Sequence, residues 1–258
     1  MSADVSTPAK AIARPGGLVR LAKKVIRKPG YAVKALGRTL ASRQFPAPEG
    51  RDFIAERIGV VSGVFTQVSG QTRGKGFGHG AILAPHAELL WSLVRDRKPA
   101  RVVETGVCNG LSSAVILAAM DRNGFGELIS VDLPEFTDPA LNTEAFWEGK
   151  GGAVVPAGRE VGWLVPAELR GRWTLQLGRS SVLLPAALAG GCDIFIHDSE
   201  HSYENQMFEF RLGWDALRPG GVLVATDINW SNAFDDFCRQ VRPRRQFVDH
   251  SCCLMFKR

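Results

Sequence analysis

From Ala100 to Thr226, short apolar runs alternate with amphipathic stretches, and this alternation limits the fold more than any other feature. Strands buried on both faces of a parallel sheet are apolar almost throughout, and strand–helix alternation is typical of a doubly wound α/β domain with a mostly parallel sheet. The predicted helices are Ser112–Met120, Ser181–Leu188 and Tyr203–Leu217. The predicted strands are Arg101–Glu104, Leu128–Asp132, Thr174–Leu177, Asp193–His197 and Val222–Thr226.

The chain around this region divides into three predicted parts. Residues 1–50 are expected to form an N-terminal helical extension, 51–98 a helical lead-in, and 99–258 the ligand-binding domain, which ends in an antiparallel hairpin. The lead-in contains a helix at Pro85–Val94 and five glycines between Gly70 and Gly80, a density that opposes regular structure. We expect this Gly-rich loop, with His79, to act as a lid.

The positive charge of the chain is concentrated at its start. The net charge is +6, but residues 1–50 hold ten Lys and Arg against two acidic residues, so the other 208 residues carry −2. Leu18, Leu21 and Val25 recur at helical spacing among these cations. Residues 17–43 are therefore expected either to contact an anionic membrane or a protein peripherally, or to be a solvated appendage. The acidic body argues against nucleic acid as a partner.

The cysteines and the hydropathy pattern bear on the cellular compartment in which the protein is expected. The five cysteines form no CxxC pair and no spacing typical of zinc sites, so reduced thiols in a cytoplasmic protein are expected. No run reaches the roughly 18 apolar residues of a membrane span, and no signal-peptide pattern is found. We therefore expect a cytoplasmic protein, with peripheral membrane attachment as an alternative.

The first strand runs into a turn that predicts a ligand site. Ligands of open parallel sheets bind at the carboxyl ends of the strands. Here the turn places Glu104 two residues before Gly106, and Cys108, Gly110 and Ser112 follow. The spacing is not the Gly-x-Gly-x-x-Gly of dinucleotide-binding turns. A carboxylate at this point repels a pyrophosphate and attracts a cation.

The second strand ends in Asp132, 22 residues after Gly110, close to the offset of about 20 at which an acid binds ribose hydroxyls. One acid for a ribose and one for a cationic group describe a nucleoside with a positively charged tail. S-adenosylmethionine fits that description.

Together, the Glu-x-Gly-x-x-x-Gly turn, Asp132, the later Pro219–Gly221 and the closing hairpin resemble a class I S-adenosylmethionine-dependent methyltransferase with its Rossmann-like sheet. The resemblance covers about Ala100 to Arg258. It implies that Glu104, Gly106, Gly110 and Asp132 line the cofactor site, with Cys108 and Ser112 in the same turn. It also implies that Gly178, Arg179 and Ser180 lie beside the adenine, although the family usually has an acid where Arg179 stands.

The fourth strand is followed by a dense group of titratable residues, Asp198, Glu200 and His201 among them. Such groups at strand tips are candidates for holding a metal or deprotonating a hydroxyl. The fifth strand ends beside Asp227, so Asp198 and Asp227 are expected to face each other across a cleft. His201 has a second interpretation as a helix cap, and His197 one as a residue of the sheet packing. Glu209 is expected on a solvated helix face.

This segment resembles the branch of the family whose fourth strand closes with Asp-x-x-His-x-Tyr-Glu, which includes metal-dependent O-methyltransferases acting on sugars and antibiotics. The resemblance implies Mg2+ held by Asp198 and by an acidic pair at the next strand tip, but only Asp227 of that pair is present. Asn229 or His201 is a substitute ligand. The alternative is a metal-free site with His201 or Glu200 as the general base, and Asp198 also beside the cofactor.

The predicted function is methyl transfer from S-adenosylmethionine to a hydroxyl of a small molecule, such as a sugar or natural product. A hydroxylase-like enzyme on the same fold and a non-catalytic cofactor-binding protein are the alternatives. A homo-oligomer is compatible with the sequence. Aromatic residues at Phe136, Phe146, Trp147, Trp163 and Trp173 are expected to form either an acceptor pocket or a satellite core, and Trp230 and Phe234 are expected to face the cleft.

Overall fold

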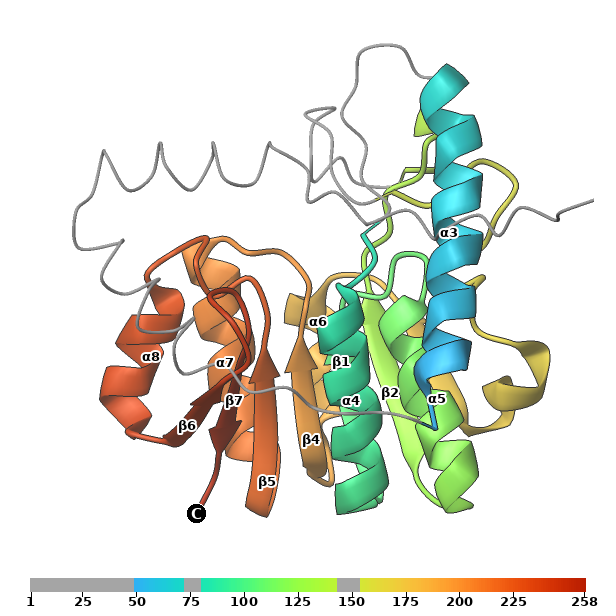
Figure 1. Cartoon of the computed structure of the whole chain (residues 1–258). Coiled ribbons are helices and arrows are strands. Elements are labelled where there is room, and N and C mark those ends of the chain that lie inside the picture. The colour runs from blue at the N-terminus through green and yellow to red at the C-terminus, as the bar shows by residue number, and fades with distance from the viewer. Residues whose placement is uncertain (1–48, 72–79, 143–153) are drawn as a thin grey trace, which may run out of the picture.

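The computed structural model describes residues 49–71, 80–142 and 154–258. Its centre is a seven-stranded sheet in the order β3-β2-β1-β4-β5-β7-β6 (Figure 1). Strands β1 to β5 are parallel, and β7 pairs antiparallel with both β5 and β6. The strands are β1 Arg101–Thr105, β2 Glu127–Asp132, β3 Trp173–Leu177, β4 Cys192–His197, β5 Leu217–Ala225, β6 Arg244–Phe247 and β7 Cys253–Phe256.

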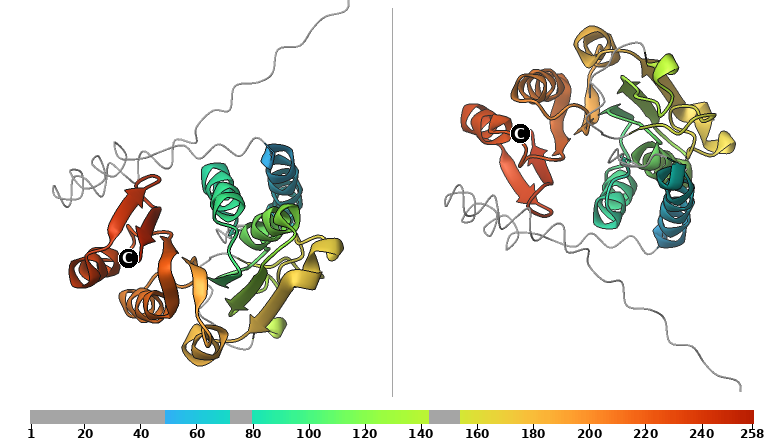
Figure 2. Two further views of the ribbon diagram at one scale, coloured as in Figure 1. Left: turned by 90° about the horizontal axis from the view of Figure 1, so that it is seen from below. Right: turned by 90° about the horizontal axis from the view of Figure 1, so that it is seen from above.

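Helices cover both faces of this sheet, as the end-on views of Figure 2 show. On one face lie α3 Arg51–Gln71, α4 Ala84–Arg97 and α5 Leu111–Asn123, and on the other α6 Ser180–Ala187, α7 Tyr203–Ala216 and α8 Ala233–Val241. Two short 3-10 helices, η1 Pro139–Leu141 and η2 Ala167–Arg172, lie in the segment between β2 and β3. The predicted doubly wound α/β fold with a terminal hairpin is confirmed.

Period-two alternation along the strands divides the core into two clusters. Val102 and Ile194 belong to the cluster under α4 and α5, whereas their neighbours Val103 and Phe195 belong to the cluster under α6, α7 and α8. Each side chain points to the opposite face from the one before it. The central strands are therefore apolar on both sides, which is why they appear in the sequence as unbroken apolar runs.

Several boundaries differ from the sequence prediction. β5 begins at Leu217 instead of Val222, and its register against β4 shifts between Cys192 and Ile194, where Pro219 and Gly220 interrupt the pairing. The sequence pattern does not predict α8. Most of the N-terminal extension and residues 72–79 of the Gly-rich loop, His79 included, lie outside the described residues. No helix in the described ranges is long and apolar enough to cross a membrane.

Two aromatic residues of the long β2–β3 connection and the first residue of β3 form a satellite core. Phe136, Trp163 and Trp173 pack around the small buried cluster Val107, Val155 and Val161. None of the three lines the cleft described below, so the prediction of an acceptor pocket is wrong for them. Phe146 and Trp147 lie outside the described residues.

Candidate active site

A cleft of about 560 Å³ opens at the carboxyl ends of β1, β2, β4 and β5. Residues just before α4 and the turn between β6 and β7 complete its wall. Most residues predicted for the site line it: Gly106, Cys108, Ser112, Asp132, Gly178, Arg179, Ser180, Asp198, Glu200, His201 and Asp227. Glu104, Gly110 and Asn229 were also predicted but do not line it.

Gly106 brings the ends of β1 and β4 into contact. Its φ is 85°, and an added Cβ would lie 2.2 Å from the backbone oxygen of Asp198. A side chain here would meet both left-handed strain and a backbone clash. This contact sets the turn after β1 directly against the first residue of the β4 tip.

Asp132 at the end of β2 is positioned by the same turn. Its carboxylate accepts the backbone N–H of Val107 at 3.0 Å and that of Cys108 at 3.4 Å. Burial raises the pKa of Asp132 to about 6, against these two hydrogen bonds. The carboxylate borders the cleft, where it can accept hydrogen bonds from a diol.

Glu104 lies beneath the cleft. One oxygen, Oε2, accepts hydrogen bonds from Ser113 at 2.6 Å and Ser130 at 2.9 Å, while Oε1 has no hydrogen-bond partner in the described residues. Complete burial raises its pKa. Because β1 alternates, the Glu104 side chain turns to the α5 face and does not reach the cleft wall. Gly110 also lies outside the cleft wall, and its lack of a side chain lets the start of α5 pack closely on Gly162. A Cβ at Gly110 would lie 2.6 Å from the Cα of Gly162.

The residues after β3 close the side of the cleft next to Asp132. The N–H of Gly178 donates to the backbone oxygen of Asp132 at 2.8 Å. Arg179 is the N-cap residue of α6, and the Ser180 hydroxyl donates to Asn205 Oδ1 at 3.3 Å. All three border the cleft as predicted.

A second polar group gathers at the tips of β4 and β5. Ligand atoms of Asp198, His201 and Asp227 lie within 4.8 Å of one another. His201 Nε2 is 3.6 Å from Asp227 Oδ2 and 4.0 Å from Asp198 Oδ1, and it is buried without a hydrogen bond among the described residues. Burial, then the neighbouring His197, lowers the pKa of His201 to about 3, so the imidazole is neutral near pH 7.

The acids of this group are also perturbed. Burial raises the pKa of Asp198 well above its usual value, and burial raises that of Asp227. The Thr226 hydroxyl lies 2.5 Å from Asp198 Oδ1. When the Nε2 lone pair of His201 faces two ionised carboxylates, the interaction is repulsive unless a proton or a cation joins them. The arrangement therefore fits a divalent cation, and three ligand atoms in one small volume supply its first contacts.

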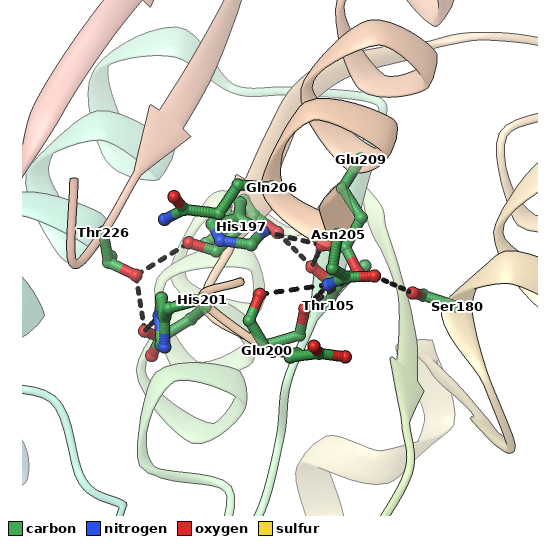
Figure 3. Close-up of polar contacts among 12 residues, drawn as sticks. Thr105, Ser180, His197, Glu200, His201, Asn205, Gln206, Glu209 and Thr226 are labelled. Atoms are coloured by element: carbon green, nitrogen blue, oxygen red, sulfur yellow. Dashed lines mark hydrogen bonds and ion pairs between the residues drawn. The ribbon is translucent and has the colours of Figure 1, made fainter. Parts of the chain in front are cut away.

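A buried network supports this group from below (Figure 3). Glu209 of α7 is fully buried, and its Oε2 accepts hydrogen bonds from Thr105 at 2.5 Å and from His197 Nδ1 at 2.7 Å. Its Oε1 accepts from Ser199 and Asn205. The prediction of a solvated Glu209 is wrong, because α7 packs directly on the sheet. His197 points into the packing, as one interpretation expected.

Two further predictions are decided by the geometry. His201 does not cap α7, since the Ser202 hydroxyl accepts the Asn205 N–H instead. Trp230 borders the cleft with its ring centroid 5.4 Å from that of His201. Phe234, also predicted there, is fully buried in the core.

The sequence prediction missed His86, near the start of α4. It borders the cleft, and its Nε2 lies 2.7 Å from Asp249 Oδ2 in the β6–β7 turn. The two residues are 163 positions apart. The only local signal was a polar residue among apolar ones in a predicted helix, which is too common to be assigned a role.

Comparisons with known proteins agree with this architecture. Residues 103–228 match the family model described as a methyltransferase domain. Among solved structures, the SAH-bound methyltransferase PaMTH1 of Podospora anserina is similar at 14% identity and a TM-score of 0.51, over 98% of this chain and 100% of that one. Cofactor-bound Rv0187 from MTB has 14% identity and a TM-score of 0.51, over 83% and 98%.

A putative caffeoyl-CoA O-methyltransferase from Staphylococcus aureus has 10% identity and a TM-score of 0.51, over 69% and 85% of the two chains. At these identities the structural matches show a shared fold. A search of curated proteins finds no match. The family match over residues 103–228, together with the fold and the cleft, supports a class I S-adenosylmethionine-dependent methyltransferase.

Proposed function

We propose that this protein transfers the methyl group of S-adenosylmethionine to a hydroxyl of a small molecule, in the class of sugars or natural products. The observation that carries the proposal is the division of one cleft into two parts. The part near Asp132 and Gly106 suits a nucleoside, and the part formed by Asp198, His201 and Asp227 suits the activation of an oxygen. Solved structures of the same fold include one described as a putative caffeoyl-CoA O-methyltransferase, which supports this reaction type.

The cofactor would be held by residues of the first part. Asp132 would accept the ribose hydroxyls, and Gly106 leaves room for close approach to the backbone. Gly178, Arg179 and Ser180 would border the adenine. Glu104, whose buried Oε1 has no partner in the described residues, would act from beneath the turn by electrostatic attraction to the positively charged end of the cofactor. Cys108 and Ser112 complete this wall.

A divalent metal would be held by Asp198, His201 and Asp227. Of the two substitutes for the missing acid, His201 is the one the geometry favours, because Asn229 does not border the cleft. Mg2+ was the expected ion, but an imidazole ligand fits Mn2+ better. When bound, the metal would lower the pKa of the acceptor hydroxyl. The protein's residues would align the acceptor oxygen with the methyl group and exclude water.

The test is direct. The full-length protein, S-adenosylmethionine, Mn2+ or Mg2+ and a panel of glycosides and phenols are incubated together, and products are read by mass spectrometry. Methylation adds about 14 mass units and hydroxylation about 16, by ordinary atomic masses, so the hydroxylase alternative is distinguished. Asp198→Asn and His201→Ala are each expected to abolish turnover, and full turnover in both variants would refute the assignment. Glu200→Gln reports on the metal-free alternative.

The remaining sequence expectations stay proposals of their own. Peripheral contact of residues 17–43 with anionic lipid or protein would be tested by vesicle sedimentation of the full chain and of a chain lacking residues 1–42. A homo-oligomer and a cytoplasmic location are likewise proposed. Their tests are light scattering and cell fractionation.

A further inference from the structure

A second imidazole, outside the Asp-x-x-His segment, borders the same cleft. His86 lies in the first turn of α4 and is 6% exposed. Its Nε2 is 2.7 Å from Asp249 Oδ2. Among the described cleft residues, His86 and His201 are the two histidines.

The protein fixes Asp249 in place. Its Oδ1 accepts hydrogen bonds from Ser251 N at 2.7 Å, Ser251 Oγ at 2.9 Å and Cys252 N at 2.9 Å. The turn is tied to the β5 tip, because Ile228 N donates to the Ser251 oxygen at 3.1 Å. With Oδ1 occupied by the turn, Oδ2 remains for the imidazole.

This arrangement sets the proton distribution on His86. Burial alone would raise the pKa of Asp249, but the hydrogen bond with His86 and the donors of the turn hold it well below its ordinary value. An ionised Asp249 keeps the proton on Nε2 of His86. With the ring proton on Nε2, Nδ1 is the nitrogen left as hydrogen-bond and proton acceptor. A carboxylate that orients an imidazole in this way is the arrangement of general bases in other enzymes.

The position relative to the second polar group is also suitable. His86 lines the same cleft as Asp198, His201 and Asp227. If His201 binds a metal through Nε2, its lone pair is no longer available for a proton. His86 is then the remaining imidazole of the described cleft residues.

Resting on the proposed methyl transfer, we propose that His86, oriented by Asp249, is the base that accepts the proton of the acceptor hydroxyl. As the oxygen forms its bond to the methyl carbon, the carbon–sulfur bond of the sulfonium breaks and its electron pair stays on sulfur. The hydroxyl proton passes to His86 Nδ1, and the imidazolium formed is stabilised by Asp249. Solvent then removes the proton, so the step releases one proton for each methyl group transferred.

A purely structural tie between α4 and the hairpin would use the same hydrogen bond. His86→Gln separates the two roles, because a glutamine amide can still donate to Asp249 but cannot act as a base near neutral pH. His86→Ala opens a space that added imidazoles can enter. His250→Ala is the matched control, a histidine of the same turn that does not border the cleft.

The experiment uses the full-length protein with Mn2+ and any acceptor of the glycoside and phenol panel that releases S-adenosylhomocysteine with the wild type. His86→Gln is expected to lower kcat by about 100-fold or more, with S-adenosylmethionine affinity and thermal midpoint close to the wild type. Asp249→Asn should lower kcat about 10-fold, and His250→Ala should leave it unchanged. In His86→Ala, imidazoles of increasing pKa should restore the rate in that order.

The inference is overturned if His86→Gln keeps kcat within threefold of the wild type. It is also overturned if rescue is independent of the pKa of the added imidazole, or if kcat falls only in step with folding stability. A wrong proposed function would be seen in the wild type and not in the His86 variants. The wild type would then neither bind S-adenosylmethionine in calorimetry nor release S-adenosylhomocysteine.

Discussion

Replacing Asp132 by asparagine is expected to stabilise the ligand-free protein and weaken cofactor binding at the same time. Burial raises the pKa of Asp132 from 3.8 to about 6, roughly 2 units, or about 3 kcal/mol of penalty on the ionised form. The asparagine side chain can still accept the Val107 N–H, but it loses the longer bond from Cys108, at about 1 kcal/mol. The net stabilisation at pH 8 is then about 2 kcal/mol.

The pH dependence has a definite sign. A carboxyl whose folded pKa is raised contributes stability below its unfolded pKa and loses it as pH rises through the folded value. The advantage of Asp132→Asn should therefore be small near pH 4 and grow up to about pH 7. Two ribose hydroxyls lose an ionised acceptor, so S-adenosylmethionine binding should weaken about 100-fold, or roughly 2.7 kcal/mol.

Urea unfolding at pH 5 and pH 8 measures the first effect, and isothermal calorimetry measures the second. Asp121→Asn, at an exposed residue near the end of α5, is the control and should change neither. A variant that is less stable than the wild type at pH 8 would refute the desolvation argument. Cofactor affinity within threefold of the wild type would refute the ribose assignment.

Three other substitutions test separate parts of the structure. Gly106→Ala should cost about 3 kcal/mol or more in urea unfolding, because its Cβ would meet the Asp198 oxygen, whereas Gly59→Ala has open space and should not destabilise; equal stabilities would refute this. Glu209→Gln should cost about 3 kcal/mol at pH 7. Since the pKa of Glu209 is lowered to about 2, the deficit should shrink as pH falls below about 4.5, and a constant deficit would contradict it. Asp227→Asn should weaken Mn2+ binding by at least about 100-fold in calorimetry, and the control Asn229→Ala should leave it unchanged. A larger loss of Mn2+ affinity in Asn229→Ala than in Asp227→Asn would make Asn229 the ligand instead.

The sequence was sufficient for the fold because the relevant signals are local. Apolar runs such as Val102–Val103 and Ile194–Ile196 are buried on both faces, so they predict central parallel strands without any knowledge of their partners. The turn at Gly106 and the acid at Asp132 follow from their place at strand ends. These positions converge because the carboxyl ends of parallel strands share one edge.

The parts that the sequence did not predict depend on contacts between distant residues. Glu209 has the pattern of an exposed helix position, and only the packing of α7 on the sheet shows it bonded to Thr105 and His197. His86 and Asp249 meet through the pairing of the terminal hairpin with β5. Asn229, two residues after the correctly placed Asp227, does not line the cleft, although Trp230 after it does.

The most direct test of the account is calorimetry of S-adenosylhomocysteine with the full-length protein. The cleft between Gly106, Asp132 and Asp198 predicts one binding site per chain, with an affinity in the micromolar range, about −8 kcal/mol. Absence of binding at millimolar ligand would contradict the assignment of this cleft to the cofactor, and with it the proposed methyl transfer.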